Sequence, residues 1–253
     1  MAGERLGVLE QLLTERGMGY KGGLYHSTQI EFAYNSNHIE GSTLTKDETR
    51  YIYETNSLAL DGNGAVNVDD IIETVNHFRC FDCLLDVAGD ELSEGIIKEF
   101  HRLLKDGTSD SRKPYFAVGG YKQVENTVGN IETVSPDKVP EAMGRLLESY
   151  NRAIEEYPDG DENAKLLNVV DFHVRFEHIH PFQDGNGRVG RLIMFKECIR
   201  NGLMPFVVED KNRIFYLRGI ERFRSDRIQL LETIRYEQGV FRERYEKLAF
   251  PRV

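Results

Sequence analysis

The chain lacks the features that mark secreted, membrane-spanning and duplex-binding proteins. It has three cysteines among 253 residues, too few and odd in number for a disulfide framework, so a reducing compartment is expected. No apolar run approaches the roughly 20 residues of a membrane-spanning helix. The net charge is -10 with bases and acids interspersed, which argues against a nucleic-acid groove. We expect a soluble, cytoplasmic protein that binds neither membranes nor nucleic acid.

Most of the sequence carries a helical pattern instead. Apolar residues recur at spacings of three and four in segments such as residues 68–85, 94–104 and 228–248, which is typical of amphipathic helices. Thr45 followed by Glu48 is the pattern of a capping box and predicts a helix start. With 40% apolar residues the chain can form a sizeable core. The pattern predicts an all-α fold.

One segment departs from this pattern. Between Val118 and Val134 the chain holds glycines and several β-branched residues, with Gly129-Asn130 between two short extended runs. That combination is a β-hairpin signal. We therefore expect one β-hairpin in an otherwise helical domain.

Residues 177–191, EHIHPFQDGNGRVGR, concentrate glycine and charge, which indicates a binding site because both are costly without a ligand or solvent to compensate them. Gly185, Gly187 and Gly190 spell the dinucleotide pattern G-x-G-x-x-G. However, Pro-Phe-Gln-Asp precedes the first glycine where an apolar strand is needed, and no βαβ alternation follows. A dinucleotide fold is therefore disfavoured.

Histidines in and before this stretch raise a zinc or iron site as a second interpretation. On a helix His173 and His180 share a face while His178 points elsewhere, and no nearby acid completes a ligand set. The C-x-x-C pair Cys80 and Cys83 has no second Cys or His pair at zinc spacing. Structural roles are favoured for these cysteines and for His178.

A phosphate-binding loop explains the stretch best. The helical pattern of residues 164–179 should end before Pro181, because proline disfavours helix in the preceding residue. A new helix should then begin around Gly187. The backbone N–H groups of residues 185–188 would lie at its start, where free donors and the helix dipole favour an anion.

The side chains around this loop suit a phosphate chain. Arg188 and Arg191 share one face of the first turn and can reach different phosphates. Asp184 offers hard oxygen atoms for Mg²⁺, and the imidazole of His180 can take a proton near neutral pH. Phe182 is expected to bury its ring and fix the loop.

Together these residues form a motif, HPFQDGNGRVGR over residues 180–191, that resembles the signature of the Fic family. Most members transfer AMP from ATP to a hydroxyl side chain of a protein. The resemblance covers about residues 90–225. It implies that His180 is the general base for a Ser, Thr or Tyr hydroxyl of a target protein, that ATP is the co-substrate, and that Asp184 holds Mg²⁺, for which Mn²⁺ could substitute.

The resemblance also assigns the nucleotide contacts. The residues expected to bind the phosphates are Gly185, Asn186, Gly187, Arg188 and Arg191. Gly187 stands where a kinase-like toxin relative has lysine, which favours nucleotidyl transfer over phosphorylation. Tyr216 is expected at the adenine, although Phe223 replaces an asparagine that some relatives use there.

The expected hairpin resembles the family's flap, which pairs with the target's backbone as an added strand. It is placed at about residues 121–133. The flap residues expected to contact the target are Tyr121, Lys122, Val128, Ile131 and Thr133.

A second element lies upstream of the signature. Ser36-x-x-x-Glu40-Gly41 resembles the inhibitory motif of one subclass, on a helix at about residues 28–41. There Glu40 would pair with Arg191 and deny it to the γ-phosphate, while Ser36 would brace the helix. Low basal activity is then expected, and relatives that reverse their own modification suggest that Glu40 also orients water for deAMPylation.

These assignments divide the chain into three functional regions. Residues 1–90 form an N-terminal helical region, residues 91–225 the Fic core, and residues 226–253 a C-terminal helix on that core. Homodimers are common in the family. Alternatives left open are transfer of another phosphate-containing group, UMP or phosphocholine, and a catalytically weak nucleotide-binding or toxin-like module.

Overall fold

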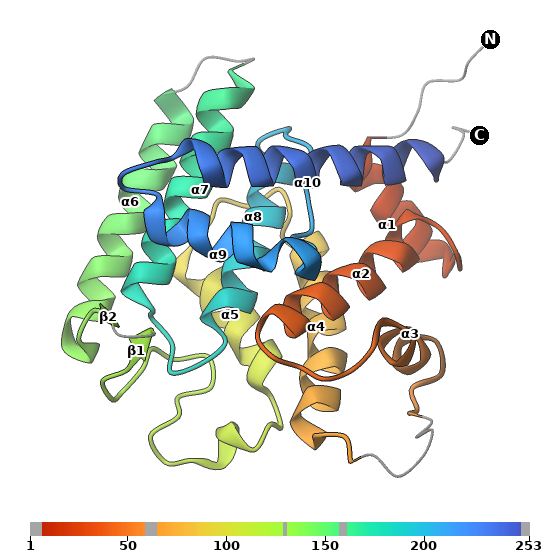
Figure 1. Cartoon of the computed structure of the whole chain (residues 1–253), viewed down its shortest axis with the longest axis horizontal. Coiled ribbons are helices and arrows are strands. Elements are labelled where there is room, and N and C mark those ends of the chain that lie inside the picture. Colours follow the sequence, from red (N-terminus) through yellow and green to blue (C-terminus); the bar gives the residue numbers. More distant parts are fainter. Residues whose placement is uncertain (1–6, 59–64, 129–130, 157–160, 249–253) are drawn as a thin grey trace. The chain divides into compact units, whose positions relative to one another are not determined.

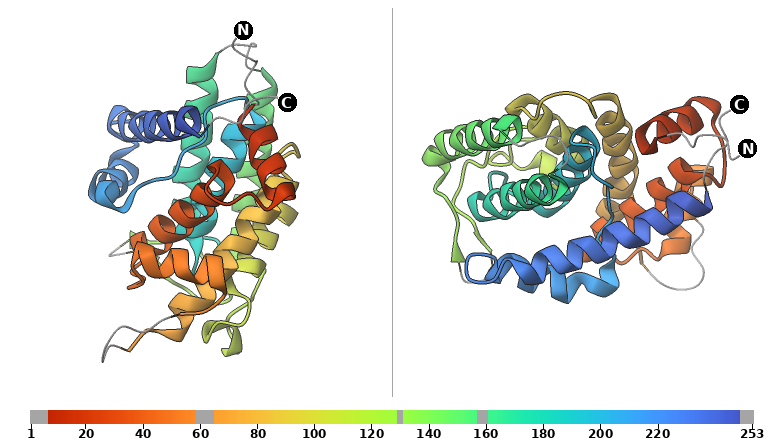
Figure 2. Two further views of the ribbon diagram at one scale, coloured as in Figure 1. Left: turned by 90° about the vertical axis from the view of Figure 1, so that its right-hand side faces the viewer. Right: turned by 90° about the horizontal axis from the view of Figure 1, so that it is seen from above.

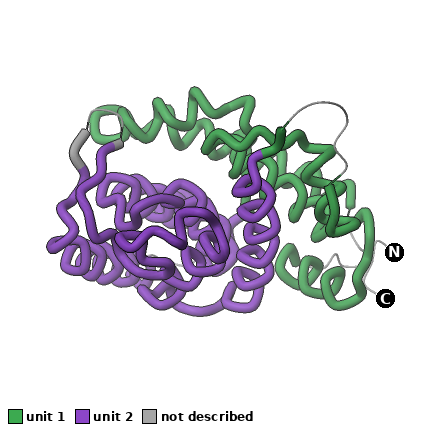
Figure 3. Tube along the Cα trace, turned by 90° about the horizontal axis from the view of Figure 1, so that it is seen from below, with its two compact units in different colours: residues 1–66, 204–253 green, residues 67–203 purple. Residues whose placement is uncertain are grey.

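The structure is a computed structural model in which helices joined by loops make up most of the fold (Figure 1). The residues that it describes are 7–58, 65–128, 131–156 and 161–248. The chain folds into two compact units, unit 1 from residues 1–66 with 204–253 and unit 2 from residues 67–203 (Figure 3). The functional division at residues 90 and 225 stays a prediction.

Unit 2 contains the signature segment. Its helices are α4 (Val68–Asp86), α5 (Glu94–Lys105), α6 (Val139–Glu156), α7 (Glu162–Ile179) and α8 (Asn186–Arg200), with the 3-10 turns η1 (Asp110–Arg112) and η2 (Pro136–Lys138). Helix α8 packs against α4, α5 and α7, and α7 packs against α6 (Figure 2). Every residue of α8 from 188 to 198 is buried, charged side chains included, which agrees with its central position among these helices.

The same helix buries a charged pair. Lys196 and Glu197 are 0% and 1% exposed, and Lys196 Nζ lies 2.6 Å from Glu197 Oε1. The hydroxyl of Tyr150 on α6 donates to Glu197 Oε2 at 2.7 Å. Buried charges are tolerated when they are paired and hydrogen-bonded, so this group joins α6 to α8 without leaving an uncompensated charge.

The expected β-hairpin flap over residues 121–133 is wrong. The observed pairing is confined to β1 (Thr127–Val128) and β2 (Ile131–Glu132), two residues a side, which is too short for a stable hairpin. Residues 121–126 contain bends and irregular backbone rather than strand. The expected turn at Gly129-Asn130 lies outside the described residues.

The physical reason for this correction lies in where the polar groups of the segment bond. The backbone N–H of Lys122 donates to the Pro181 carbonyl at 2.8 Å, and Asn126 Nδ2 donates to the Phe182 carbonyl at 3.1 Å. A β-ladder would need the Lys122 N–H to face a partner strand. The segment packs on the signature loop instead.

Unit 1 combines the two ends of the chain. Its helices are α1 (Val8–Met18), α2 (Leu24–Ile39), α3 (Lys46–Thr55), α9 (Arg213–Arg222) and α10 (Ile228–Lys247), with the 3-10 turn η3 (Asp210–Asn212). Gln11 Nε2 donates to the Leu248 carbonyl at 2.7 Å, and the Asp210 N–H donates to Asn35 Oδ1 at 2.9 Å. These bonds join segments that are distant in sequence.

The capping box predicted from Thr45 and Glu48 is confirmed at the start of α3. The Glu48 N–H donates to Thr45 Oγ1 at 3.2 Å, and the Thr45 N–H donates to Glu48 Oε2 at 2.7 Å.

Among the described residues, no helix is long and apolar enough to cross a membrane.

Gly190 provides a test of the packing between α7 and α8. A Cβ atom at this position would lie 2.7 Å from the His173 ring and from Glu177 Oε1, both on α7. Gly190→Ala should therefore lower the free energy of unfolding by about 1–3 kcal/mol through overpacking, measured by urea denaturation.

Gly144 on α6 is the matched control, because a Cβ there meets nothing within 4 Å. Gly144→Ala should raise the free energy of unfolding by about 0.5–1 kcal/mol, since alanine loses less backbone entropy in a helix. Equal effects of the two substitutions would contradict the close approach of α7 and α8.

Candidate active site

The signature loop runs from the end of α7 to the start of α8 and carries two residues of positive φ. His180 caps α7 in the left-handed conformation, with φ 51°, and its N–H donates to the Phe176 carbonyl at 2.9 Å. Gly185 precedes α8 with φ 83°. A non-glycine residue in this region costs about 1–3 kcal/mol, and such residues cluster at functional sites. The conformation of His180 agrees with the role expected for it, although Asn56 ends α3 in the same conformation.

Two contacts hold the loop in place. Phe182 is fully buried, and its ring stacks on the His101 ring of α5 with centroids 4.0 Å apart. The Asn186 side chain accepts from the Phe182 N–H and donates to the Phe182 carbonyl, both at 2.9 Å. The amide that the resemblance assigns to phosphate binding is thus engaged in closing the loop.

His101 supports the loop as a neutral ring. Its Nδ1 accepts the Gly119 N–H at 3.0 Å. Burial, with the Lys105 ammonium nearby, lowers the pKa of His101 to about 3. A neutral imidazole can both accept this bond and stack on Phe182 without the cost of burying a charge.

The start of α8 is suited to bind an anion. It begins at Asn186, close to the expected start, and its N-cap Gly185 offers no side-chain cap to the first N–H groups. Such donors together with the helix dipole attract negative charge. The positive φ favours glycine at this position, and a Cβ on Gly185 would lie 3.2 Å from Leu104 Cδ2, so that side chain would have to shift.

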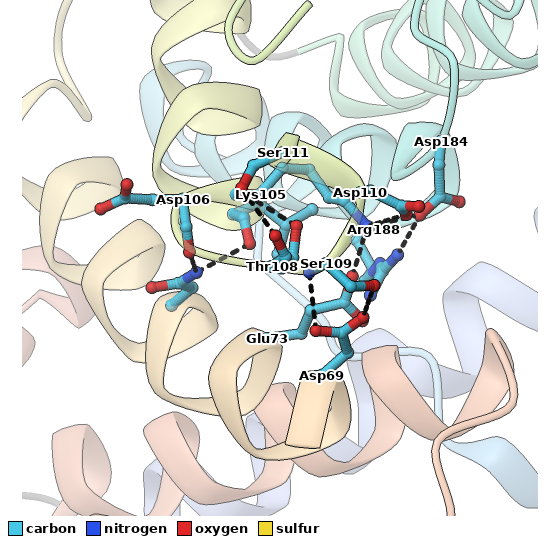
Figure 4. A network of polar contacts seen from close by, with 12 residues as sticks. Asp69, Glu73, Lys105, Asp106, Thr108, Ser109, Asp110, Ser111, Asp184 and Arg188 are labelled. Atoms are coloured by element: carbon cyan, nitrogen blue, oxygen red, sulfur yellow. Dashed lines mark hydrogen bonds and ion pairs between the residues drawn. The ribbon is translucent and has the colours of Figure 1, made fainter. Parts of the chain in front are cut away.

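Beside this helix start, four charged residues form a closed ring (Figure 4). Lys105 Nζ at the end of α5 lies 2.6 Å from Glu73 Oε1 on α4 and 2.7 Å from Asp184 Oδ2. Arg188 on α8 contacts Glu73 Oε2 through Nη1 and Asp184 Oδ2 through Nη2, the latter at 3.1 Å. We call Glu73, Lys105, Asp184 and Arg188 the charge ring.

The burial of the charge ring is uneven. The side chains of Lys105, Arg188 and Glu73 are 2%, 5% and 13% exposed, whereas that of Asp184 is 50% exposed. Asp110 adds a further carboxylate at 3.1 Å from Lys105 Nζ. Asp184 is thus the member of the ring that solvent, and hence a ligand, can reach.

The ionisation of the ring follows from its pairings. Burial favours the neutral form of Asp184, but the neighbouring Arg188 and Lys105 outweigh it and hold its pKa well below the usual range. Burial likewise lowers the pKa of Lys105, but Asp184 and Glu73 outweigh it and the net pKa is raised. Asp184 is therefore a carboxylate and Lys105 an ammonium at neutral pH.

Asp184 fits the expected Mg²⁺ ligand. It is ionised, half-exposed and adjacent to an anion-binding helix start, and Mg²⁺ is commonly held by one or two carboxylates together with substrate phosphates. Within the described ranges, no three His, Cys, Asp or Glu side chains are grouped to hold a metal ion. The donor set therefore suits an ion that arrives with phosphates.

The two histidines considered with His180 for a metal site, His173 and His178, have different surroundings. His173 is buried, and burial together with Arg191 lowers its pKa to about 3. His178 is half-buried with Nδ1 2.6 Å from the Val174 carbonyl.

Arg191 lies one turn beyond Arg188 on α8 and is 3% exposed. The inhibitory and adenine-site residues expected from the sequence belong to unit 1. Ser36 is buried on α2, Glu40 is exposed at the C-cap of that helix, and Gly41 follows with φ 102°. Tyr216 is buried on α9. The expected Glu40–Arg191 pair joins the two units and stays a prediction.

The residues assigned to the flap have their own contacts in unit 2. Lys122 Nζ donates to Asn126 Oδ1 at 2.7 Å and to Thr133 Oγ1 at 2.5 Å, and burial lowers the pKa of Lys122 to about 8. Lys98 Nζ lies 4.1 Å from the centroid of the Tyr121 ring. Val128 and Ile131 are opposite each other in the short ladder.

Sequence reasoning missed Glu73, Lys105 and His101. All three lie on α4 or α5, outside the signature, and each resembles an ordinary polar position of an amphipathic helix. The sequence placed these three residues on amphipathic helices, but helical periodicity does not indicate which side chains contact a loop that is distant in sequence.

Comparisons with known proteins match the segment that carries this loop. A family model described as the Fic/DOC family matches residues 91–198. The protein adenylyltransferase fic-1 of Caenorhabditis elegans is 28% identical over 198 residues, which are 78% of this chain and 37% of that protein. A protein adenylyltransferase Fic of Nematostella vectensis is 26% identical over 191 residues, 74% of this chain and 41% of that protein. The chain thus matches about two fifths of the length of these relatives.

Solved structures share the fold. A Fic domain containing signaling protein from Bacteroides thetaiotaomicron superposes with a TM-score of 0.71 at 21% identity, covering 95% of this chain and 94% of that one. A Fic-1 structure from C. elegans gives a TM-score of 0.71 at 20% identity, covering 94% of this chain and 69% of that one. With the signature loop in its place between α7 and α8, residues 91–198 of the chain resemble the Fic/DOC family, and the chain shares the fold of solved Fic structures.

Proposed function

We propose that the chain is a protein adenylyltransferase, which moves AMP from ATP to a Ser, Thr or Tyr hydroxyl of a target protein. The observation that carries the proposal is the signature loop, which brings His180, the half-exposed Asp184 and the uncapped start of α8 together within unit 2. The names of the curated relatives from C. elegans and N. vectensis support it.

In the proposed reaction the imidazole of His180 takes the proton of the target hydroxyl. The hydroxyl oxygen forms a bond to the α-phosphorus of ATP, and the bond from that phosphorus to the bridging α–β oxygen breaks. AMP becomes attached to the target and pyrophosphate leaves with the electron pair. His180 suits this role because it lies at the end of α7, beside the helix start that would hold the phosphates.

The phosphates are proposed to lie at the start of α8. Its first N–H groups and the dipole of a 15-residue helix stabilise the negative charge that moves toward pyrophosphate. Arg188 and Arg191 lie one turn apart on that helix and are proposed to hold the inner phosphates and the γ-phosphate. Asp184 would hold Mg²⁺, which supplies positive charge between phosphate oxygens.

We also propose that Glu40 regulates this site by pairing with Arg191. Glu40 is exposed at the end of α2, where the helix stops before a glycine of positive φ. A carboxylate on Arg191 would compete with the γ-phosphate for the same guanidinium.

The source of the transferred group tests the function. The protein is incubated with Mg²⁺, a lysate and ATP labelled at the α- or the γ-phosphate. Label should pass to protein from the α position alone, and His180→Ala should lower the rate by about 10²–10⁴-fold through loss of the base. Protein labelling is measured after gel separation.

His178→Ala is the matched control, because this histidine lies two residues away and bonds to a backbone carbonyl of its own helix. It should retain most of the activity. Label from the γ position would identify a kinase, and transfer from labelled UTP but not ATP would identify another nucleotidyltransferase. Either result excludes the proposal.

The regulatory role of Glu40 has its own test. Glu40→Gly should raise the initial rate of α-label transfer by at least about ten-fold, which corresponds to a competing interaction of about 1.4 kcal/mol. Glu48→Gln, on the neighbouring helix α3, is the control and should leave the rate unchanged. An unchanged rate in Glu40→Gly would remove Glu40 from the regulation of this enzyme.

A further inference from the structure

Lys105 has the surroundings of a bound cation. Its ammonium is 2% exposed, and its donors are directed at carboxylates of three different elements: Glu73 on α4 at 2.6 Å, Asp184 in the signature loop at 2.7 Å, and Asp110 in η1 at 3.1 Å (Figure 4). Carboxylate oxygens around a positive centre are also what a divalent metal ion binds. The ammonium therefore occupies a position where positive charge is stabilised.

The charges around Asp184 balance because of this lysine. The ion pairs join the three positive charges of Lys105, Lys113 and Arg188 to the three negative charges of Glu73, Asp110 and Asp184, counted over the described residues of this cluster. Removal of the Lys105 charge would leave the three carboxylates with two cations. An isolated divalent cation would then meet a net attraction that the native arrangement lacks.

We propose that Lys105 is a positioning residue that acts as the resident counter-ion of Asp184. In the nucleotide-free protein it keeps free divalent cations away from this carboxylate, so that Mg²⁺ binds at Asp184 together with the phosphates of a nucleotide. The inference rests on the proposed nucleotide chemistry at Asp184, and it assigns to Lys105 a role in the order of binding.

The proposed order of binding follows from the opposite charges of the two ligands, a divalent cation and a nucleotide. An ammonium within hydrogen-bond distance of Asp184 repels a divalent cation that approaches the same carboxylate, and in a partly buried site this repulsion is weakly screened. The same ammonium attracts the phosphates of a nucleotide. Lys105 should therefore weaken the binding of a metal ion alone and strengthen the binding of a nucleotide alone.

Its location makes the role specific to Lys105. Lys113 also contacts Asp110, at 2.6 Å, but it is 47% exposed and is not a partner of Asp184. The guanidinium of Arg188 is divided between Glu73 and Asp184 and belongs to the signature itself. Lys105 is thus a buried cation on the metal ligand that the signature does not encode.

Two binding measurements on the full chain test the proposal. Mn²⁺ binding without nucleotide is measured by electron paramagnetic resonance, and ATP binding in the presence of EDTA by calorimetry. In Lys105→Met the dissociation constant for Mn²⁺ should fall at least about ten-fold while that for metal-free ATP rises at least about three-fold, because one charge acts on ligands of opposite sign.

Further variants separate charge from structure. Lys105→Arg, which keeps the charge, should bind Mn²⁺ as weakly as the wild type. Lys113→Met, which removes an exposed lysine, should change each constant by less than about two-fold. Glu73→Gln, which removes a negative charge, should raise the dissociation constant for Mn²⁺ and lower that for metal-free ATP. Asp184→Asn in the Lys105→Met background should remove the gain in Mn²⁺ affinity.

The proposal is overturned if Lys105→Met binds Mn²⁺ no more tightly than the wild type. It is also overturned if this variant weakens both ligands together, which is the result expected from local loss of structure. Neither measurement involves group transfer, so failure of the proposed transferase activity would be seen separately in the labelling assay.

Discussion

The charge ring is the constraint on which the candidate site depends. Glu73, Lys105 and Arg188 come from three helices, α4, α5 and α8, and Asp184 comes from the loop before α8. Removal of these charges from water costs several kcal/mol per ion unless each has partners. Because every member contacts two others, the ring is stable only when all three helices and the loop are in place.

This arrangement links folding to chemistry in unit 2. The loop is closed by the Asn186 amide on the Phe182 backbone and by the stack of Phe182 on His101, so its shape exists before any ligand arrives. Within the same loop His180 has a left-handed conformation, and Asp184 remains half-exposed. Preorganised groups of this kind need little rearrangement when charge develops in a reaction.

Local patterns in the sequence were sufficient for much of the helical structure. Thr45 and Glu48 predicted the start of α3, and Pro181 predicted where α7 ends, because capping bonds and proline sterics act within a few residues. The hairpin prediction failed for the converse reason. Its residues are locally compatible with strand and turn, but Lys122 and Asn126 bond to the signature loop about 60 residues away.

The sequence by itself determined the signature, the helical register and the chemistry of His180, Asp184 and the two arginines, because these depend on residue type and short spacing. Only the tertiary structure decided that Lys105 and Glu73 surround Asp184, and that His101 supports Phe182. Helical periodicity tells which face of α4 or α5 is buried. The hydrogen-bond and ion-pair partners of a buried polar residue lie on other elements, and only the packed helices bring them together.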